Sequence, residues 1–215
     1  MNATKKLQIT GYIGLLGSLI MFTGDMLLYF TTEPFNDISK EFLPSMGSVP
    51  PARMYAGGLV GPLAAFCLMI GFYHLYLSVK VPRKTVAKLM LLLLSVAIVM
   101  GGAYHALFPT FGVVARQGHP ELVPLLFEYA KCLGLGLAIS IGLGWLIFCY
   151  LVLRKQTIYP RWIIVATPLI SLWFGILWEH LPQPFLIVIA GGWNSLVLTI
   201  FFAVSLIVLR NKKID

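Results

Sequence analysis

The chain has 215 residues, of which 59% are hydrophobic and only 11% charged, and its mean hydropathy is +0.87. Globular domains average roughly 45–50% apolar and about 25% charged residues. These figures argue against a soluble fold and exclude a disordered chain or a coiled coil. Three cysteines in a chain of this length form no disulfide framework. We therefore predict an all-α protein that uses a lipid bilayer as its solvent.

Six apolar segments follow one another along the chain, each long enough to cross a hydrocarbon core of about 30 Å as a helix. Their length and lack of alternation predict helices rather than barrel strands. They leave no room for a second domain, so we expect residues 1–215 to form one six-helix transmembrane domain. The predicted spans are about 8–30, 54–79, 89–108, 124–153, 162–179 and 184–209.

The charged residues are distributed unevenly between the predicted loops. Twelve of the 16 basic residues lie near the two termini or in the loops around residues 80–88 and 154–161. Seven of the eight acidic residues lie on the other side or in that half of a span. Because basic residues mark cytoplasmic loops, we predict a plasma (cytoplasmic) membrane protein with both termini inside. The net charge of +8 then reflects topology and attraction to anionic lipids, which are the expected partners, so no nucleic-acid partner is predicted.

Two predicted outer loops, 31–52 and 109–123, are long enough to form structure of their own. The first contains four prolines and three acidic residues, and we expect it to form an ordered cap or a short interfacial helix. The cysteines at positions 67, 132 and 149 all fall within spans and are interpreted as buried packing residues. The oligomeric state is not predicted.

Polar residues recur in the outer half of every predicted span. Ionisable groups in a bilayer are costly and usually face a bundle interior, a partner or water, so we expect these residues to converge on a pocket. Small residues beside them, such as Gly57 and Gly61, would allow close approach of the helices. The predicted ligand-binding residues are Asp25, Arg53, Tyr55, Tyr104, His105, Glu128, Lys131, Glu179, Trp193 and Asn194.

Structural interpretations stand beside these functional ones. Asp25 could simply pair with Arg53, and Glu128 with Lys131 three positions later on the same helix. Asn194 could serve only to join two helices by a hydrogen bond.

Three further sites could lie at the membrane surface instead of in a pocket. These are His105, the pair at 179–180, and His74, which is flanked by Tyr73 and Tyr76 and is interpreted as a residue of the inner interface.

The sequence offers few signs of catalytic chemistry. It contains no phosphate-binding loop, no CxxC, no HExxH and no GxSxG motif. Acid–base chemistry could use His105, Glu128 or Asp25. A metal site could combine His105 and His180 with a carboxylate, but no two histidines share a helical turn. We therefore predict no cofactor and no metal.

Five segments resemble a known family. They are Gly24–Tyr29, Gly57–Pro62, Gly71–Tyr76, Ala103–Pro109 and Gly191–Leu196. Together they resemble an uncharacterised family of bacterial six-helix integral membrane proteins that is carried as a domain of unknown function. The resemblance covers nearly the whole chain, and it implies an inner-membrane location and no activity.

The leading functional hypothesis is an integral membrane protein whose outward polar pocket binds a small amphipathic ligand for transport or sensing. Asp25, Arg53, Glu128 and Lys131 would bind the charged group of the ligand. Tyr55, Tyr104 and Trp193 would form apolar walls and make cation–π contacts. One alternative is an intramembrane enzyme that acts on a lipid-like substrate by acid–base or metal chemistry. A second alternative is a structural or assembly protein without a ligand. Whether the protein is an enzyme is left open.

Overall fold

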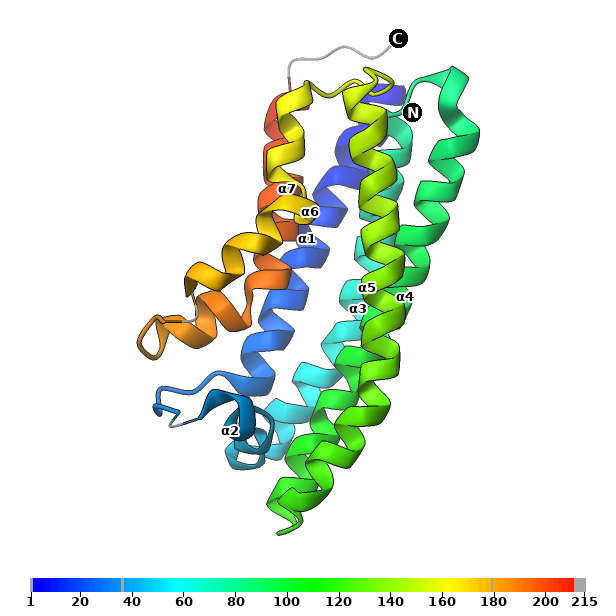
Figure 1. Ribbon diagram of the computed structural model, residues 1–215. Coiled ribbons are helices and arrows are strands. Elements are labelled where there is room, and N and C mark those ends of the chain that lie inside the picture. Colours follow the sequence, from blue (N-terminus) through cyan, green and yellow to red (C-terminus); the bar gives the residue numbers. More distant parts are fainter. Residues whose placement is uncertain (1, 36, 179, 211–215) are drawn as a thin grey trace.

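The structure is a computed structural model and describes residues 2–35, 37–178 and 180–210 (Figure 1). Four long helices dominate the described residues, and each is long and apolar enough to cross a membrane. They are α1 (Ala3–Tyr29), α3 (Pro51–Ser78), α4 (Lys84–Arg116) and α5 (Val123–Leu153). The all-helical prediction is confirmed, and these helices indicate a membrane protein.

The fifth and sixth apolar segments are irregular rather than continuous α-helices. Pro168 interrupts the fifth because it has no backbone N–H to donate. The sixth begins with one turn or so of π-helix before it becomes α-helical. The elements are η4 (Arg161–Ala166), α6 (Pro168–Ser171), η5 (Leu172–Trp178), the π-helix η6 (Leu186–Gly191) and α7 (Trp193–Leu209).

Helix α4 extends further than the sequence suggested. It continues through Pro109 to Arg116, so most of the expected loop 109–123 is helical. Proline is tolerated inside a membrane helix when neighbouring groups compensate for the lost backbone bond. Here the ring of Pro109 packs directly against Gly58 of α3, where no side chain obstructs it. The chain turns back at Gly118, whose positive φ of 84° favours glycine.

A short helical cap joins α1 to α3, as the sequence predicted. It consists of α2 (Ile38–Ser45) and the 3-10 helix η1 (Met46–Ser48). Arg116 fastens this cap to α4, because its Nε donates to the Gly47 carbonyl at 3.0 Å and its Nη2 donates to the Val49 carbonyl. The cap lies at one end of the molecule, called here the α2 end; Asn2 and Arg210 lie at the opposite end, called the terminal end (Figure 1).

The helices pack in the order α7–α1–α3–α4–α5. Helices α1 and α3 approach so closely that a Cβ at Gly14 would lie 2.8 Å from the Cα of Gly71. The principal core fills the terminal half, where Phe72, Trp145 and Phe201 are fully buried. At the α2 end, by contrast, the hairpin formed by η5 and η6 diverges from α5 (Figure 1). The terminal half thus contains the principal core, and two smaller clusters of buried residues lie at the α2 end.

Candidate functional site

A buried polar cluster joins four helices in the half of the bundle near α2. Asp25 of α1 is 9% exposed, and its Oδ2 accepts a hydrogen bond from the Ser195 hydroxyl of α7 at 2.7 Å. Its Oδ1 lies 3.5 Å from Nδ1 of His105 on α4. The other ring nitrogen of His105 lies 3.1 Å from the Gly57 carbonyl of α3. The cluster therefore ties α1, α3, α4 and α7 together at one depth.

The hydrogen bond to Gly57 fixes the protonation pattern of the ring. A carbonyl oxygen can only accept, so Nε2 of His105 carries a hydrogen. Nδ1 faces Oδ1 of Asp25 at 3.5 Å, and a proton shared between these two atoms would make the pair neutral overall. Neutrality suits a pair that is buried between helices, since an unpaired charge there is costly.

Tyr29 extends this cluster toward the sixth segment. Its hydroxyl lies beside the Asp25 carboxyl and donates to the carbonyl of Gly191 at 2.9 Å. Gly191 ends the π-helix η6, and a Cβ at this position would lie 3.1 Å from the Tyr29 ring. Single π-helical turns occur frequently at functional sites. The irregular start of the sixth segment is thus in direct contact with the buried pair.

An open cleft of about 1030 Å³ lies next to this cluster at the α2 end. Its walls come from α2, from Tyr104 and Phe108 of α4, from the residues around the start of α5 and from the π-helix η6, with His180 beside them. Most of the lining is apolar and includes Phe42, Leu43, Phe127, Leu186 and Ile187. A concave, mainly apolar surface with a few polar groups is the usual form of a small-molecule site.

Only one layer of side chains separates the cleft from the buried pair. Phe108 lines the cleft and stacks on the His105 ring, with the ring centroids 6.0 Å apart and the planes 26° apart. Tyr104 lines the cleft beside it and meets Phe108 edge to face at 5.2 Å. Gly191, whose carbonyl accepts the hydrogen bond from Tyr29, also lines the cleft. A molecule in the cleft would therefore contact the immediate neighbours of Asp25 and His105.

The rim of the cleft carries its charged and titratable residues, Lys40, Glu121 and His180. Lys40 donates a hydrogen bond to the Asp37 carboxylate, with Nζ and Oδ2 2.9 Å apart, and this bond raises the pKa of Lys40 above its usual value. Lys40 therefore stays a cation at every physiological pH. An apolar interior with a charged rim suits an amphipathic molecule.

Of the residues predicted to bind a ligand, the structure brings together Asp25 and His105, and it places Tyr104 in the adjacent cleft wall. The alternative pairing of Asp25 with Arg53 is wrong. Arg53 instead donates from Nε to the Leu27 carbonyl at 2.9 Å and from Nη2 to the carbonyls of Met26 and Phe30. These carbonyls lie at the C-terminal end of α1, where a cation also complements the helix dipole.

Glu128 and Lys131 lie apart from this cluster. They form the expected local ion pair on α5, 2.5 Å between Oε1 and Nζ, with their side chains 66% and 53% exposed. Such a pair contributes less than about 1 kcal/mol to stability. Neither residue lines the cleft.

The remaining predicted residues have varied positions. Tyr55 is 49% exposed, and Asn194 is also exposed. Trp193 donates from Nε1 to the Ser171 carbonyl at 3.1 Å, which joins α7 to α6. His180 lies on the cleft rim, while Glu179 lies outside the described residues.

Ser195 was missed by sequence reasoning. It lies next to Asn194, which was predicted instead, but Asn194 is exposed whereas Ser195 is buried against α1. The buried glycine and serine positions of α1 could have indicated which face of α7 packs there.

His74 was wrongly assigned to the interface and is fully buried. Its Nδ1 lies 2.7 Å from the Leu7 carbonyl, and its Nε2 lies 2.7 Å from the Ser205 hydroxyl and 2.8 Å from the Tyr159 hydroxyl. Tyr159 lies in the connection after α5, and burial raises the pKa of its phenol well above the usual value. A partner supplied by a distant loop leaves no periodic signal in the sequence.

No group of three potential metal ligands occurs in the described part of the chain. The three cysteines are free thiols, and Cys132 is exposed on α5 rather than buried as expected. The described residues therefore offer hydrogen-bonding and acid–base groups rather than a metal cage.

The fold and the buried cluster define an all-helical membrane protein with a buried polar centre behind an apolar cleft. The chain belongs to a family of unknown function, DUF6796, whose family model matches residues 1–212. This match confirms the resemblance to an uncharacterised family. No curated protein and no solved structure matches the chain.

Proposed function

We propose that this membrane protein binds an amphipathic, lipid-like molecule in the cleft at the α2 end. The observation that carries the proposal is the cleft itself, whose volume of about 1030 Å³ and mainly apolar lining are combined with the charged rim residues Lys40 and Glu121. A lipid-like molecule would place its apolar part against Phe127 and Ile187 and its polar end at the rim.

The packing of the bundle favours binding over passage through the protein. The terminal half contains the principal core, in which Leu68, Phe72, Trp145 and Phe201 are buried. His74, the ionisable residue in this half that transport could have used, has both ring nitrogens engaged by protein groups. A sensing or carrier role on one side of the membrane fits this arrangement better than alternating access.

The runner-up function is acid–base chemistry on a lipid-like substrate. It is favoured by the buried pair of Asp25 and His105, which would share one transferable proton. Phe108 and Tyr104 cover this pair on the cleft side, so a substrate would reach it only if these rings moved. Binding requires no such movement and is therefore our principal proposal.

Fluorescence titration with 11-(dansylamino)undecanoic acid tests the binding proposal directly. The probe has an apolar chain and an anionic end, and we expect saturable binding to the purified protein in detergent. Ala190→Phe fills part of the cleft, because Ala190 belongs to its lining on η6. We expect this variant to bind the probe about tenfold more weakly, since an added ring removes the space for several methylene groups.

The matched control is Ala138→Phe, which adds the same ring on the exposed face of α5 outside the cleft. It should bind the probe within about twofold of the parent protein. Equal affinity of the two variants, or no saturable binding by the parent protein, would contradict the proposal.

A further inference from the structure

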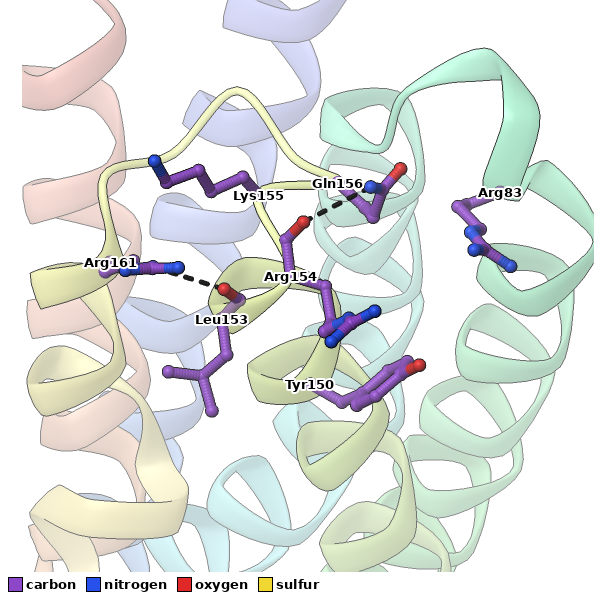
Figure 2. Close-up of a pocket in the computed structure, with 7 residues that line it drawn as sticks. All are labelled: Arg83, Tyr150, Leu153, Arg154, Lys155, Gln156 and Arg161. Atoms are coloured by element: carbon purple, nitrogen blue, oxygen red, sulfur yellow. Dashed lines mark hydrogen bonds between the residues drawn. The ribbon is translucent and has the colours of Figure 1, made fainter.

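A second, smaller hollow of about 280 Å³ lies at the terminal end of the bundle (Figure 2). Four of the residues that line it are cations, namely Arg83, Arg154, Lys155 and Arg161, and none is acidic. No carboxylate in the described part of the chain lies within ion-pairing distance of these four. Several like charges thus share one concave site, and no acidic residue among those that the structure describes balances them.

Backbone pairing between two connections builds this site. The N–H of Lys80 donates to the Gln156 carbonyl at 2.8 Å, and the N–H of Ile158 donates to the Ser78 carbonyl at 3.0 Å. These bonds join the connection before α4 to the connection after α5, so Arg83 is held opposite residues 154–156. The placement of Arg83 opposite this loop is therefore a property of the backbone fold.

The side chains within the hollow are also positioned. Arg161 donates from Nε to the Leu153 carbonyl at 3.1 Å, which caps the end of α5 and leaves its terminal guanidinium nitrogens without a protein partner among the described residues. Figure 2 shows the Arg154 guanidinium beside the Tyr150 ring, with Arg83 on the neighbouring helix and Lys155 extending along the loop. Arg83, Arg154 and Arg161 line the hollow from three different positions along it (Figure 2).

The chemistry of these residues points to a phosphate group. A guanidinium presents paired N–H donors that match the oxygens of a phosphate, and an anion would relieve the mutual repulsion of the cations. The hollow also borders the exposed apolar surface of α5. Tyr150 and Leu153 also line the hollow, and they are 54% and 52% exposed on the apolar surface of this helix. Charged donors therefore lie directly beside a surface suited to acyl chains.

We propose that this hollow binds the phosphate of an anionic phospholipid head group, with the lipid chains running along α5 past Tyr150 and Leu153. Basic pockets between membrane helices are suited to anionic head groups. The site is separate from the cleft at the α2 end, and the proposal does not depend on the function proposed for that cleft.

Native mass spectrometry of the full chain tests the proposal, with phosphatidylglycerol and phosphatidylcholine added separately to the detergent-solubilised protein. We expect phosphatidylglycerol to remain bound and phosphatidylcholine to be lost at equal concentration. The double variant Arg83→Gln/Arg154→Gln should bind phosphatidylglycerol about tenfold more weakly, since two charge-assisted contacts are removed. The variant Arg83→Lys/Arg154→Lys keeps the charge and should show a smaller loss, because an ammonium lacks the paired donors.

The control is Lys5→Gln/Lys88→Gln, which removes the same charge from two exposed positions outside the hollow. Affinity within about twofold of the parent protein is expected for this control, because diffuse attraction per residue is weak. An equal loss in both glutamine variants would overturn the proposal and indicate general attraction to the basic end. Displacement of phosphatidylglycerol by equimolar inorganic phosphate would overturn the lipid assignment in favour of a soluble phosphate ligand.

Discussion

Each of the two buried histidines needs a hydrogen-bond partner for both ring nitrogens, and the two rings donate to a backbone carbonyl from opposite nitrogens. His105 donates from Nε2 to the carbonyl of Gly57, whereas His74 donates from Nδ1 to the carbonyl of Leu7. In each ring the second nitrogen meets a side chain from another element, which is Asp25 for His105 and Tyr159 for His74. Both ring nitrogens of each histidine therefore have a protein partner between the helices, where an unpartnered polar group would be costly.

The protonation of the Asp25–His105 pair leads to a prediction at the residue scale. If Asp25 holds the shared proton, Asp25→Asn preserves both a donor to His105 and an acceptor for Ser195, and we expect it to lower stability by less than about 1 kcal/mol. Asp25→Leu leaves two buried polar groups without partners and should cost about 2–4 kcal/mol. Unfolding of the detergent-solubilised variants, followed by tryptophan fluorescence, measures both effects.

Equal destabilisation by Asn and Leu would show that the pair is instead a carboxylate and an imidazolium. Ser195→Ala provides a control within the same cluster. It removes only the hydroxyl that donates to Asp25, so its effect should be close to about 1 kcal/mol.

At the scale of the elements, close approach of helix backbones creates the space for these histidines. Gly61 of α3 faces the His105 ring, and Gly11 of α1 faces His74, with a Cβ at Gly11 2.9 Å from Cε1 of that ring. The same pattern lets Pro109 of α4 pack on Gly58. The glycines of α1 and α3 therefore have two effects: they allow the helices to pack closely, and they leave room for the histidine rings between them.

A comparison of two glycines on different helices, Gly61 and Gly142, gives the prediction at the scale of the elements. A Cβ at Gly61 would lie 2.8 Å from Cγ of His105, so Gly61→Ala forces the ring or the helix to move and should cost about 1–3 kcal/mol. Gly142 of α5 has nothing within 4 Å of such a Cβ. Gly142→Ala should therefore be neutral or stabilise by up to about 1 kcal/mol, because alanine is the better helix former.

Thermal unfolding in one detergent compares these two variants. A result in which both glycines tolerate alanine equally would show that His105 does not occupy the space beside Gly61.

For the molecule as a whole, the distribution of charge agrees with the arrangement of the helices. The described basic residues near the chain ends and in the two connections at 79–83 and 154–160 gather at the terminal end, while the cap formed by α2 and η1 lies at the other (Figure 1). The start of α1 and the end of α7 lie at the same end of the bundle, so we expect an even number of crossings (Figure 1). The bundle thus has one basic end and one end that carries the open cleft.

Topology supplies the prediction at the whole-molecule scale. We expect the terminal end to face the cytoplasm, because basic residues are retained on that side. After Cys67, Cys132 and Cys149 are replaced by serine, single cysteines at Lys5 and Arg210 should react with a membrane-impermeant maleimide only in inverted vesicles. A cysteine at Ser48 in η1 should react only in right-side-out vesicles.

Labelling of Lys5→Cys and Arg210→Cys from opposite sides would contradict an even number of crossings. Labelling of both from the outside would reverse the orientation while leaving the number of crossings intact.

The polar residues show how far the sequence could predict the site. Burial cost alone indicated that Asp25 and His105 would turn inward, and the structure brings them together. The cost of burial did not predict the position of Glu128 correctly. This residue forms an ion pair with Lys131, three positions later, on an exposed face of α5. The same argument also missed Ser195, since a small hydroxyl carries little signal of its own.

The sequence by itself determined the class of the protein: too few charges for a soluble surface, long apolar helices, and a basic end distinct from an acidic one. Those properties depend on composition and on local periodicity. Only the tertiary structure decided that the last two segments are broken by 3-10 and π turns, and that η6 diverges from α5 to leave a cleft. Such features depend on which helices pack against each other, and contacts between distant residues leave no periodic trace in the chain.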